Sequence, residues 1–195
     1  MSLRHSRRDS PRLAFLLAFL AHPSRVGAVL PTSRWAVRDM LDMADVRGAD
    51  LVVELGPGTG VYTREILTRL RPDARLIAIE RDPTLARLLA EHHQDPRLRV
   101  VCDSAENAEQ HLDGATAQVV VSGLPLTSLP ADVRDRILQQ MVSILAPGGT
   151  NLVLQYSTAV RRRLEAVFPY VRRRFSPWNV PPALLFACSM TDPRS

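Results

Sequence analysis

Three glycines and one acidic residue form the most informative pattern in this chain. They lie within residues 53–60 (VELGPGTG), between a short apolar run and an amphipathic stretch. Glycine tolerates positive φ and leaves bare backbone against which a ligand can lie at the carboxyl end of a strand. The turn that we expect to form the floor of a binding site consists of Gly56, Pro57, Gly58, Thr59 and Gly60.

The spacing of this pattern distinguishes two classes of cofactor. Dinucleotide-binding proteins use G-x-G-x-x-G, and their pyrophosphate lies on a helix N-terminus. Here the order is E-x-G-x-G-x-G, with Glu54 two residues before the first glycine. A carboxylate at that place is poorly positioned for phosphate but suits the cationic amino-acid end of S-adenosylmethionine. A purely structural turn between a strand and a helix remains the alternative.

Three later features agree with such a cofactor. Glu80, followed by Arg81, ends the next apolar run about 20 residues after the glycines, where an acid can accept hydrogen bonds from ribose hydroxyls. The third run ends at Asp103, Ser104 and Ala105, where we expect the adenine edge. Residues 147–149 (PGG) form a turn before the fifth run. Each acid alone is equally compatible with a surface position.

This order of motifs resembles that of S-adenosylmethionine-dependent methyltransferases, and the resemblance implies a methyl acceptor at the end of the fourth apolar run. Ser122 would border the cofactor, and Gly123, Leu124 and Pro125 would contact the acceptor. A plain turn is the alternative. Enzymes that methylate base amines often place an Asn/Asp-Pro-Pro-aromatic tetrapeptide here, and this chain has neither the acid or amide nor the aromatic side chain that a flipped base needs. A nucleic acid substrate is therefore not expected.

Three further residues are candidates for holding the attacking amine. Tyr156 and Asn179 would orient it as catalytic residues, and Tyr156 or Trp178 would attract a methylated cation through its ring. Packing near the mouth of the cleft is the alternative for each. The predicted reaction is in-line attack of a neutral amine on the sulfonium methyl, with S-adenosylhomocysteine as product.

Strands and helices alternate along the chain, which is typical of α/β proteins. Apolar runs predict strands at 51–55, 75–79, 98–102, 118–121 and 151–156, and near 171–175 and 184–190. Helices are predicted at 11–21, 34–43 (capped by Ser33), 61–70, from Asp82-Pro83 onward, at 131–145 and at 159–168. Each parallel strand would then present its carboxyl end to the same edge of one sheet.

The ordered motifs resemble class I S-adenosylmethionine-dependent methyltransferases. The chain is more closely similar to bacterial phospholipid N-methyltransferases, which methylate phosphatidylethanolamine stepwise toward phosphatidylcholine, and more distantly to rRNA adenine dimethylases. The similarity is carried by residues 15–29 (FLLAFLAHPSRVGAV), 53–61 (VELGPGTGV), 122–130 (SGLPLTSLP) and 179–183 (NVPPA). The resemblance implies a Rossmann-like fold with a seven-stranded, mostly parallel sheet, helices on both faces and an antiparallel C-terminal strand.

The chain departs from this family at two places. Leu17 and Ala21 stand where further basic residues are usual, and the fifth strand ends in residues 154–157 (LQYS) without a following Gly-Pro. The acceptor therefore stays open between a phospholipid amine, an rRNA adenine and a small soluble amine. A catalytically silent cofactor-binding protein is a further alternative.

Charge is concentrated in two basic segments. Residues 1–38 carry seven arginines and one aspartate, residues 39–160 carry eleven arginines and seventeen acids, and residues 161–174 carry six arginines and Glu165. Such clusters suit a polyanion, here an anionic membrane surface, although solvated arginines are the alternative. We expect a disordered basic tail (1–10), a helical segment that meets the membrane or covers the substrate (11–45) and a cofactor-binding domain (46–195).

Composition excludes several other classes of protein. Cys102 and Cys188 lie in separate apolar runs, which predicts reduced thiols packed in strands and no metal site. The apolar run Leu13–Ala21 is shorter than the ~20 residues needed to span a bilayer. Ser6-Arg7-Arg8 resembles a twin-arginine export signal, but Asp9-Ser10-Pro11 interrupts it. The expected location is cytoplasmic, peripherally bound to the inner face of the membrane.

Overall fold

The computed structural model describes residues 32–179 and 181–192, and the part from Thr32 onward forms one compact unit. The predicted basic tail and apolar helix at 11–21 lie outside the described residues. The helices are α3 (Arg34–Leu41), α4 (Val61–Leu67), α5 (Pro83–His92), η1 (Ala105–His111), α6 (Ala131–Ser143), η2 (Thr158–Val160) and α7 (Arg161–Val167). The strands are β1 (Leu51–Leu55), β2 (Arg75–Glu80), β3 (Leu98–Cys102), β4 (Ala117–Ser122), β5 (Leu145–Gln155), β6 (Tyr170–Ser176) and β7 (Ala183–Ser189).

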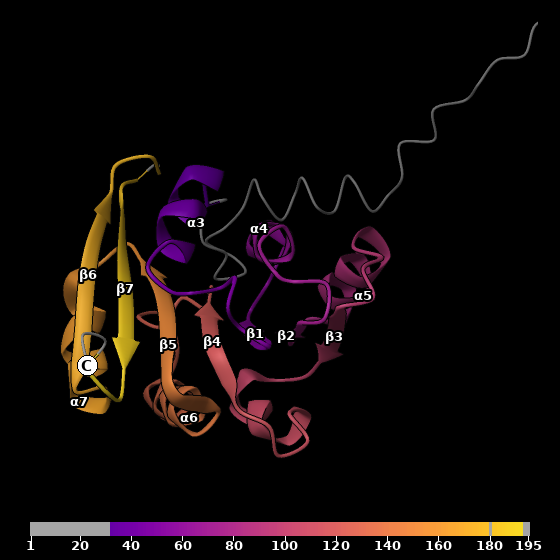
Figure 1. The fold of residues 1–195 in the computed structure, drawn as a ribbon. Helices are drawn as coiled ribbons and strands as arrows, with labels where there is room; N and C mark the ends of the chain where they lie inside the picture. The colour runs from indigo at the N-terminus through magenta and orange to yellow at the C-terminus, as the bar shows by residue number, and fades with distance from the viewer. Residues whose placement is uncertain (1–31, 180, 193–195) are drawn as a thin grey trace, which may run out of the picture. The chain divides into compact units, whose positions relative to one another are not determined.

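Within the described part of the chain, seven strands form one sheet in the order β3-β2-β1-β4-β5-β7-β6 (Figure 1). The five strands from β3 to β5 pair in parallel, and β7 runs antiparallel between β5 and β6. This confirms the predicted mostly parallel sheet with an antiparallel C-terminal strand. Every residue of β1 is buried, because a central parallel strand is covered on both faces.

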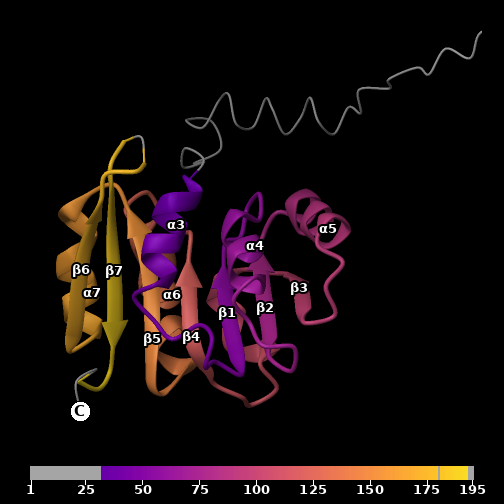
Figure 2. The same cartoon turned by 45° about the horizontal axis from the view of Figure 1, so that its top comes forward.

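Helices pack on both faces of the sheet, as predicted. Figure 2 shows α3, α4 and α5 in front of the sheet, and α6 and α7 behind it. Successive strand residues point to opposite faces, so Val52 joins the core beneath α3 and α4 while Val53 joins the core beneath α6 and α7. The two cores fix the strands between the helix layers and so fix the positions of their carboxyl ends.

Two helix starts predicted from the sequence are confirmed. The Ser33 hydroxyl accepts the N–H of Ala36 at 3.1 Å and caps α3. The Asp82 carboxylate accepts the N–H groups of Thr84 and Leu85 at 2.8 and 3.0 Å, and Pro83 occupies the first turn of α5. Both caps place a helix start at the edge where the strands end.

The start of β5 was predicted wrongly. The strand begins at Leu145 instead of residue 151, because residues 147–149 (PGG) lie inside it as an irregularity in the pairing with β4. Gly148 has φ +76°, and a Cβ on Gly149 would stand 2.9 Å from the carbonyl oxygens of Ala146 and Gln118. The glycines therefore allow a bulge within the strand, whereas a turn before it was expected.

Two smaller features also differ from the sequence analysis. The short helix η1 was not predicted. Cys102 is exposed, so only Cys188 is packed in the sheet as expected. Burial raises the pKa of the Cys188 thiol to about 12.

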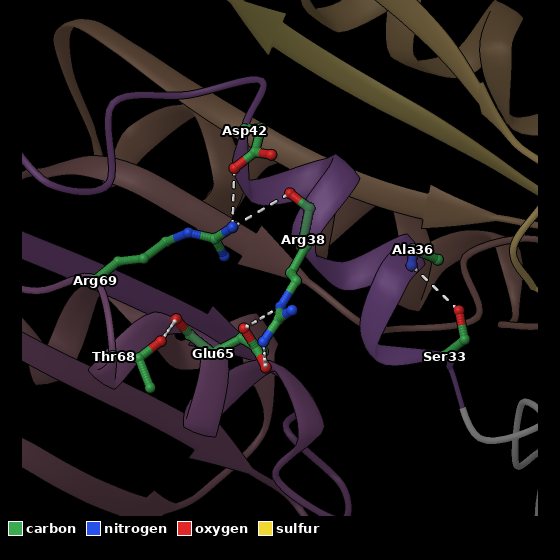
Figure 3. Close-up of polar contacts among 7 residues, drawn as sticks. All are labelled: Ser33, Ala36, Arg38, Asp42, Glu65, Thr68 and Arg69. Carbon is green, nitrogen blue, oxygen red and sulfur yellow. Dashed lines mark hydrogen bonds and ion pairs between the residues drawn. The ribbon is translucent and has the colours of Figure 1, made fainter.

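Two ion pairs tie α3 to α4. Arg38 lies 3.1 Å from the buried carboxylate of Glu65, and Arg69 lies 2.8 Å from Asp42 (Figure 3). Arg69 also donates to the carbonyl of Arg38 at 3.5 Å. These contacts hold the second half of α3 and its C-terminal cap against α4 and the residues that follow it.

Candidate active site

The residues singled out at strand ends lie along one edge of the sheet. Leu55 pairs with Ile79 of β2 and with Ser122 of β4, and Glu80 pairs with Cys102, directly before Asp103. The parallel pairing therefore places the ends of four neighbouring strands side by side. Ligands of open α/β sheets bind at this edge.

The glycine turn follows β1 and uses positive φ three times. Gly56, Gly58 and Gly60 have φ of +71°, +55° and +80°. A Cβ on Gly56 would come within 2.4 Å of Leu124, and one on Gly60 within 2.6 Å of Leu89. A Cβ on Gly58 would meet no atom within 4 Å, so this glycine faces open space. Gly56 and Gly60 are needed for packing, whereas Gly58 leaves room.

Glu54 lies directly beneath this turn and is fully buried. Its Oε2 accepts a hydrogen bond from the Thr63 hydroxyl at 2.7 Å, while Oε1 finds no partner among the residues that the structure describes. Burial raises the pKa of Glu54 to about 8, against the lowering effect of the hydrogen bonds with Thr63. The carboxyl group thus has one unused oxygen in a site that favours its neutral form.

Glu80 fastens the glycine turn to the end of β2. Its Oε2 accepts the N–H of Gly58 at 3.0 Å, and its Oε1 accepts the N–H of Asp82 at 2.9 Å. Each carboxylate oxygen can accept more than one hydrogen bond, so Glu80 keeps capacity for hydroxyl donors. The neighbouring Arg81 is exposed.

Asp103 is the centre of a polar cluster after β3. Its carboxylate accepts from the Ser104 N–H at 2.6 Å and from the Asn107 side chain at 3.0 Å, and it lies 2.7 Å from His111 Nε2. His111 and then Asn107 lower the pKa of Asp103. Ala105, the third residue expected here, is buried at the start of η1.

The acceptor loop after β4 packs tightly against the glycine turn. The N–H of Gly123 donates to the carbonyl of Leu55 at 3.0 Å, and Ser122 is fully buried. The amide of Gln155 donates to the carbonyl of Leu124 at 2.9 Å. Leu124 and the following Pro125 therefore leave the sheet on a loop fixed from two neighbouring strands.

Tyr156 and Asn179 lie in contact, although 23 residues separate them. The side-chain amide of Asn179 donates to the Tyr156 hydroxyl at 3.1 Å, and its carbonyl oxygen accepts the N–H of Ser33 at 2.6 Å. Asn179 is buried, whereas Trp178 beside it is 66% exposed. The structure thus joins the end of β5, the β6–β7 hairpin and the start of α3 through one amide.

Comparison with known proteins places this geometry in a family. Residues 52–149 match the methyltransferase domain family. The ornithine lipid N-methyltransferase of Singulisphaera acidiphila is 35% identical over 179 residues, which cover 89% of this chain and 93% of that protein. The chain belongs to the methyltransferase family.

It is an S-adenosylmethionine-dependent methyltransferase of class I. Ribosomal RNA small subunit methyltransferase A of Parasynechococcus marenigrum is 31% identical over 152 residues, which cover 77% of this methyltransferase and 49% of that protein. The solved DhpI–S-adenosylhomocysteine complex shares the fold with a TM-score of 0.63 at 15% identity, over 91% of this chain and 90% of that one. The predicted fold, family and cofactor are thereby confirmed.

The residues at the strand ends of the methyltransferase fit S-adenosylmethionine. The unused Oε1 of Glu54 offers a buried acceptor for an ammonium group, and the open space at Gly58 leaves room for a ligand against the backbone. Glu80 and Asp103 follow on the adjacent strands in the order in which ribose and adenine extend from such an ammonium.

Sequence reasoning missed several side chains that shape the site of the methyltransferase. Tyr62 is buried beneath the acceptor loop, where its Cε2 would stand 3.4 Å from a Cβ on Gly123. Burial raises the pKa of Tyr62, and its hydroxyl donates to Thr32 at 3.4 Å. Tyr62 and Gln155 contact residues that are distant in the sequence, so the sequence gives no sign of their roles. His111, which follows Asp103 by eight residues, is the one partner that its position in the sequence could have suggested.

Two arginines of the second basic segment are engaged within the fold. Arg172 and Arg174 donate to the carbonyls of Met43 and Asp39 at 3.0 Å each. They hold the end of α3 and its following turn, so the basic cluster at 161–174 is only partly available to a polyanion.

Over residues 32–179 and 181–192, no group of three or more His, Cys, Asp and Glu side chains is arranged to hold a metal ion. A bilayer-spanning helix is likewise not found in that part of the methyltransferase.

Proposed function

We propose that this methyltransferase transfers methyl groups to the amine of a membrane lipid headgroup. One observation carries the proposal: the 35% identity to an ornithine lipid N-methyltransferase extends over nearly the full length of both chains. The resemblance to phospholipid N-methyltransferases adds phosphatidylethanolamine as a candidate acceptor. Both lipids carry a primary amine in the headgroup of an acylated molecule.

The cofactor is proposed to lie across the ends of β1, β2 and β3. Glu54 would receive the ammonium group above the turn from Gly56 to Gly60, Glu80 the ribose hydroxyls, and Asp103 the adenine amino group. Arg81, Ser104, Ala105 and Ser122 would line the same cleft. Since Glu80 already binds the Gly58 N–H, ribose binding and the shape of the turn would be coupled.

The chain positions the reacting groups. When bound, S-adenosylmethionine supplies a methyl group on a positively charged sulfur, and transfer is in line. Gly123, Leu124 and Pro125 would form the wall against which the amine approaches, fixed by Gln155. The nitrogen–carbon bond forms as the carbon–sulfur bond breaks, and the bonding electrons go to sulfur.

The amine must lose its proton before it attacks. We infer that the Tyr156 hydroxyl, held by Asn179, orients the nitrogen while solvent at the cleft mouth accepts the proton. Trp178 would face the methylated cation as it leaves. This arrangement assigns orientation, and not proton abstraction, to the two proposed catalytic residues.

The test is a methyl-acceptor assay with labelled S-adenosylmethionine. Mixed micelles containing phosphatidylethanolamine or ornithine lipid are compared with small subunit rRNA and with ethanolamine as a soluble amine. We expect label in one or both lipids and in neither control. Label in rRNA or ethanolamine alone, with none in lipid, would overturn the proposal.

A further inference from the structure

The hairpin that joins β6 and β7 exposes two aromatic side chains. Phe175 is 60% exposed and Trp178 is 66% exposed. Exposed aromatic residues that gather in one place mark an interaction surface, whereas isolated ones are common. The position of these two residues relative to the proposed site is therefore informative.

Both aromatics lie at the edge of the sheet that carries the proposed site. β6 pairs antiparallel with β7, which pairs antiparallel with β5, so β6 runs parallel to β5 and ends at the same edge. Phe175 is next to the last residue of β6. Trp178 precedes Asn179, whose amide binds the Tyr156 hydroxyl. The hairpin thus stands beside the acceptor end of the cleft.

Free positive charges lie on the same side as Phe175. In the β6–β7 register, Phe175 and Arg173 face Leu184 and Phe186, which belong to the core beneath α7. Arg173 is exposed and has no ion-pair or hydrogen-bond partner in the described residues, unlike its neighbours Arg172 and Arg174.

The first turn of α7 adds two more arginines to this side. Arg162 and Arg163 are exposed and, within residues 32–179 and 181–192, pair with no acid, whereas Arg161 binds Glu165. This turn follows the end of β5 by a few residues, so it also lies at the edge of the site. Three exposed guanidinium groups thus lie at the edge of the sheet where β6 ends.

We propose that Phe175 and Trp178, flanked by Arg162, Arg163 and Arg173, dock the protein on an anionic lipid bilayer. Tryptophan and phenylalanine insert at the headgroup level, and arginines attract anionic lipid. Because the hairpin touches Tyr156 through Asn179, docking sets the acceptor loop at the depth of the lipid amines. This inference rests on the proposed function, since it assumes that the acceptor is a lipid.

Fluorescence of Trp178 tests the docking surface directly. The chain has two tryptophans, so Trp35→Phe leaves Trp178 as the reporter in the full-length protein. Vesicles of phosphatidylethanolamine and phosphatidylglycerol should shift its emission to the blue, and brominated lipids should quench it. Unchanged emission, whether or not the protein sediments with the vesicles, overturns the proposal. An emission shift with RNA but not with vesicles does so as well.

Matched variants distinguish vesicle binding through this surface from non-specific adsorption of the protein. Phe175→Ser with Trp178→Ser should lower vesicle partitioning at least tenfold, as should Arg162→Gln, Arg163→Gln and Arg173→Gln together. Tyr170→Ser changes an exposed aromatic at the opposite end of β6 and should leave partitioning unchanged. Equal partitioning of all variants, each with a native circular dichroism spectrum, overturns the surface.

The two proposals fail in different ways. If the protein methylates lipid in micelles but the emission of Trp178 does not change with vesicles, the proposed docking surface is wrong and the proposed function stands. A blue-shifted Trp178 without methyl transfer to any lipid removes the function. It also shows that the surface binds membranes for another purpose.

Discussion

The Thr63 hydroxyl donates a 2.7 Å hydrogen bond to Oε2 of Glu54, and both side chains are fully buried. Within the described residues, no donor reaches Oε1 of the same carboxyl. An unpaired buried charge is costly, so a buried carboxyl with an unused oxygen stays neutral unless a cationic donor binds to it. An arriving ammonium would supply that donor.

Glu54→Gln should weaken binding of S-adenosylmethionine by 10- to 100-fold. A hydrogen bond to a charged group contributes about 1.5–3 kcal/mol, and glutamine keeps the shape but loses the charge. Titration calorimetry measures the change, with Glu109→Gln as the control because Glu109 is exposed. Equal affinity of the two variants would remove Glu54 from the site.

The contribution of Glu54 to the stability of the ligand-free protein should fall as pH rises from about 4.5 to about 8. Burial raises the pKa of Glu54 from 4.5 to about 8, so the folded state binds its proton more tightly than the unfolded chain does. Between these values the folded state carries more protons, and raising the pH costs stability. Melting temperatures of wild type and Glu54→Gln should therefore diverge with pH, the variant becoming relatively more stable.

Binding of the cofactor at pH 7 should release a proton. Glu54 is mostly neutral there in the free protein, and a neighbouring ammonium favours the carboxylate. Calorimetry in phosphate and in Tris should give binding enthalpies that differ by the ionisation enthalpies of the buffers, and Glu54→Gln should abolish the difference. Identical enthalpies for wild type in both buffers would contradict the coupling.

Gly58→Ala should abolish cofactor binding with little loss of stability beyond backbone strain. Gly58 has φ +55° and its added methyl would enter the open space proposed for the ligand. Gly114 is a matched control, since it has φ +79° and equally open surroundings but precedes β4, away from the carboxyl ends of the strands. Each alanine should cost about 1 kcal/mol of stability. Only Gly58→Ala should lose affinity, and retained binding would refute the proposed cleft.

Tyr156→Phe should lower kcat about tenfold without changing cofactor affinity. The variant keeps the ring but removes the hydroxyl that Asn179 holds, so an orienting role is lost while packing is kept. Tyr170→Phe, on the exposed start of β6, is the control. An unchanged kcat would leave Tyr156 with a packing role alone.

The gathering of the three acids at one edge of the sheet could be predicted because it follows from local order. Glu54, Glu80 and Asp103 lie at or next to the carboxyl ends of successive apolar runs, and parallel pairing brings such ends together. The helix caps Ser33 and Asp82 were visible for the same reason, since a cap acts within three residues of itself.

Contacts made through space could not be predicted in this way. The ring of Tyr62 under Gly123 and the amide of Gln155 on Leu124 depend on how helices and strands pack. The bulge at Gly148 was taken for a turn, because a glycine pair at the start of a strand and one inside it have the same sequence. The hydrogen bonds of Arg172 and Arg174 to the end of α3 were not predicted, because a run of arginines in a sequence indicates only a basic surface.

The bonds from Arg172 and Arg174 to the carbonyls of Met43 and Asp39 span 129 and 135 residues. During synthesis from the N-terminus, α3 is therefore made long before the side chains that fasten it. A chain released before β6 would retain the glycine turn and its acids but would lack the guanidinium groups that secure α3. The side chains that fasten α3 are thus synthesised late, after the strands β1 to β4 that carry the proposed cofactor site have been translated.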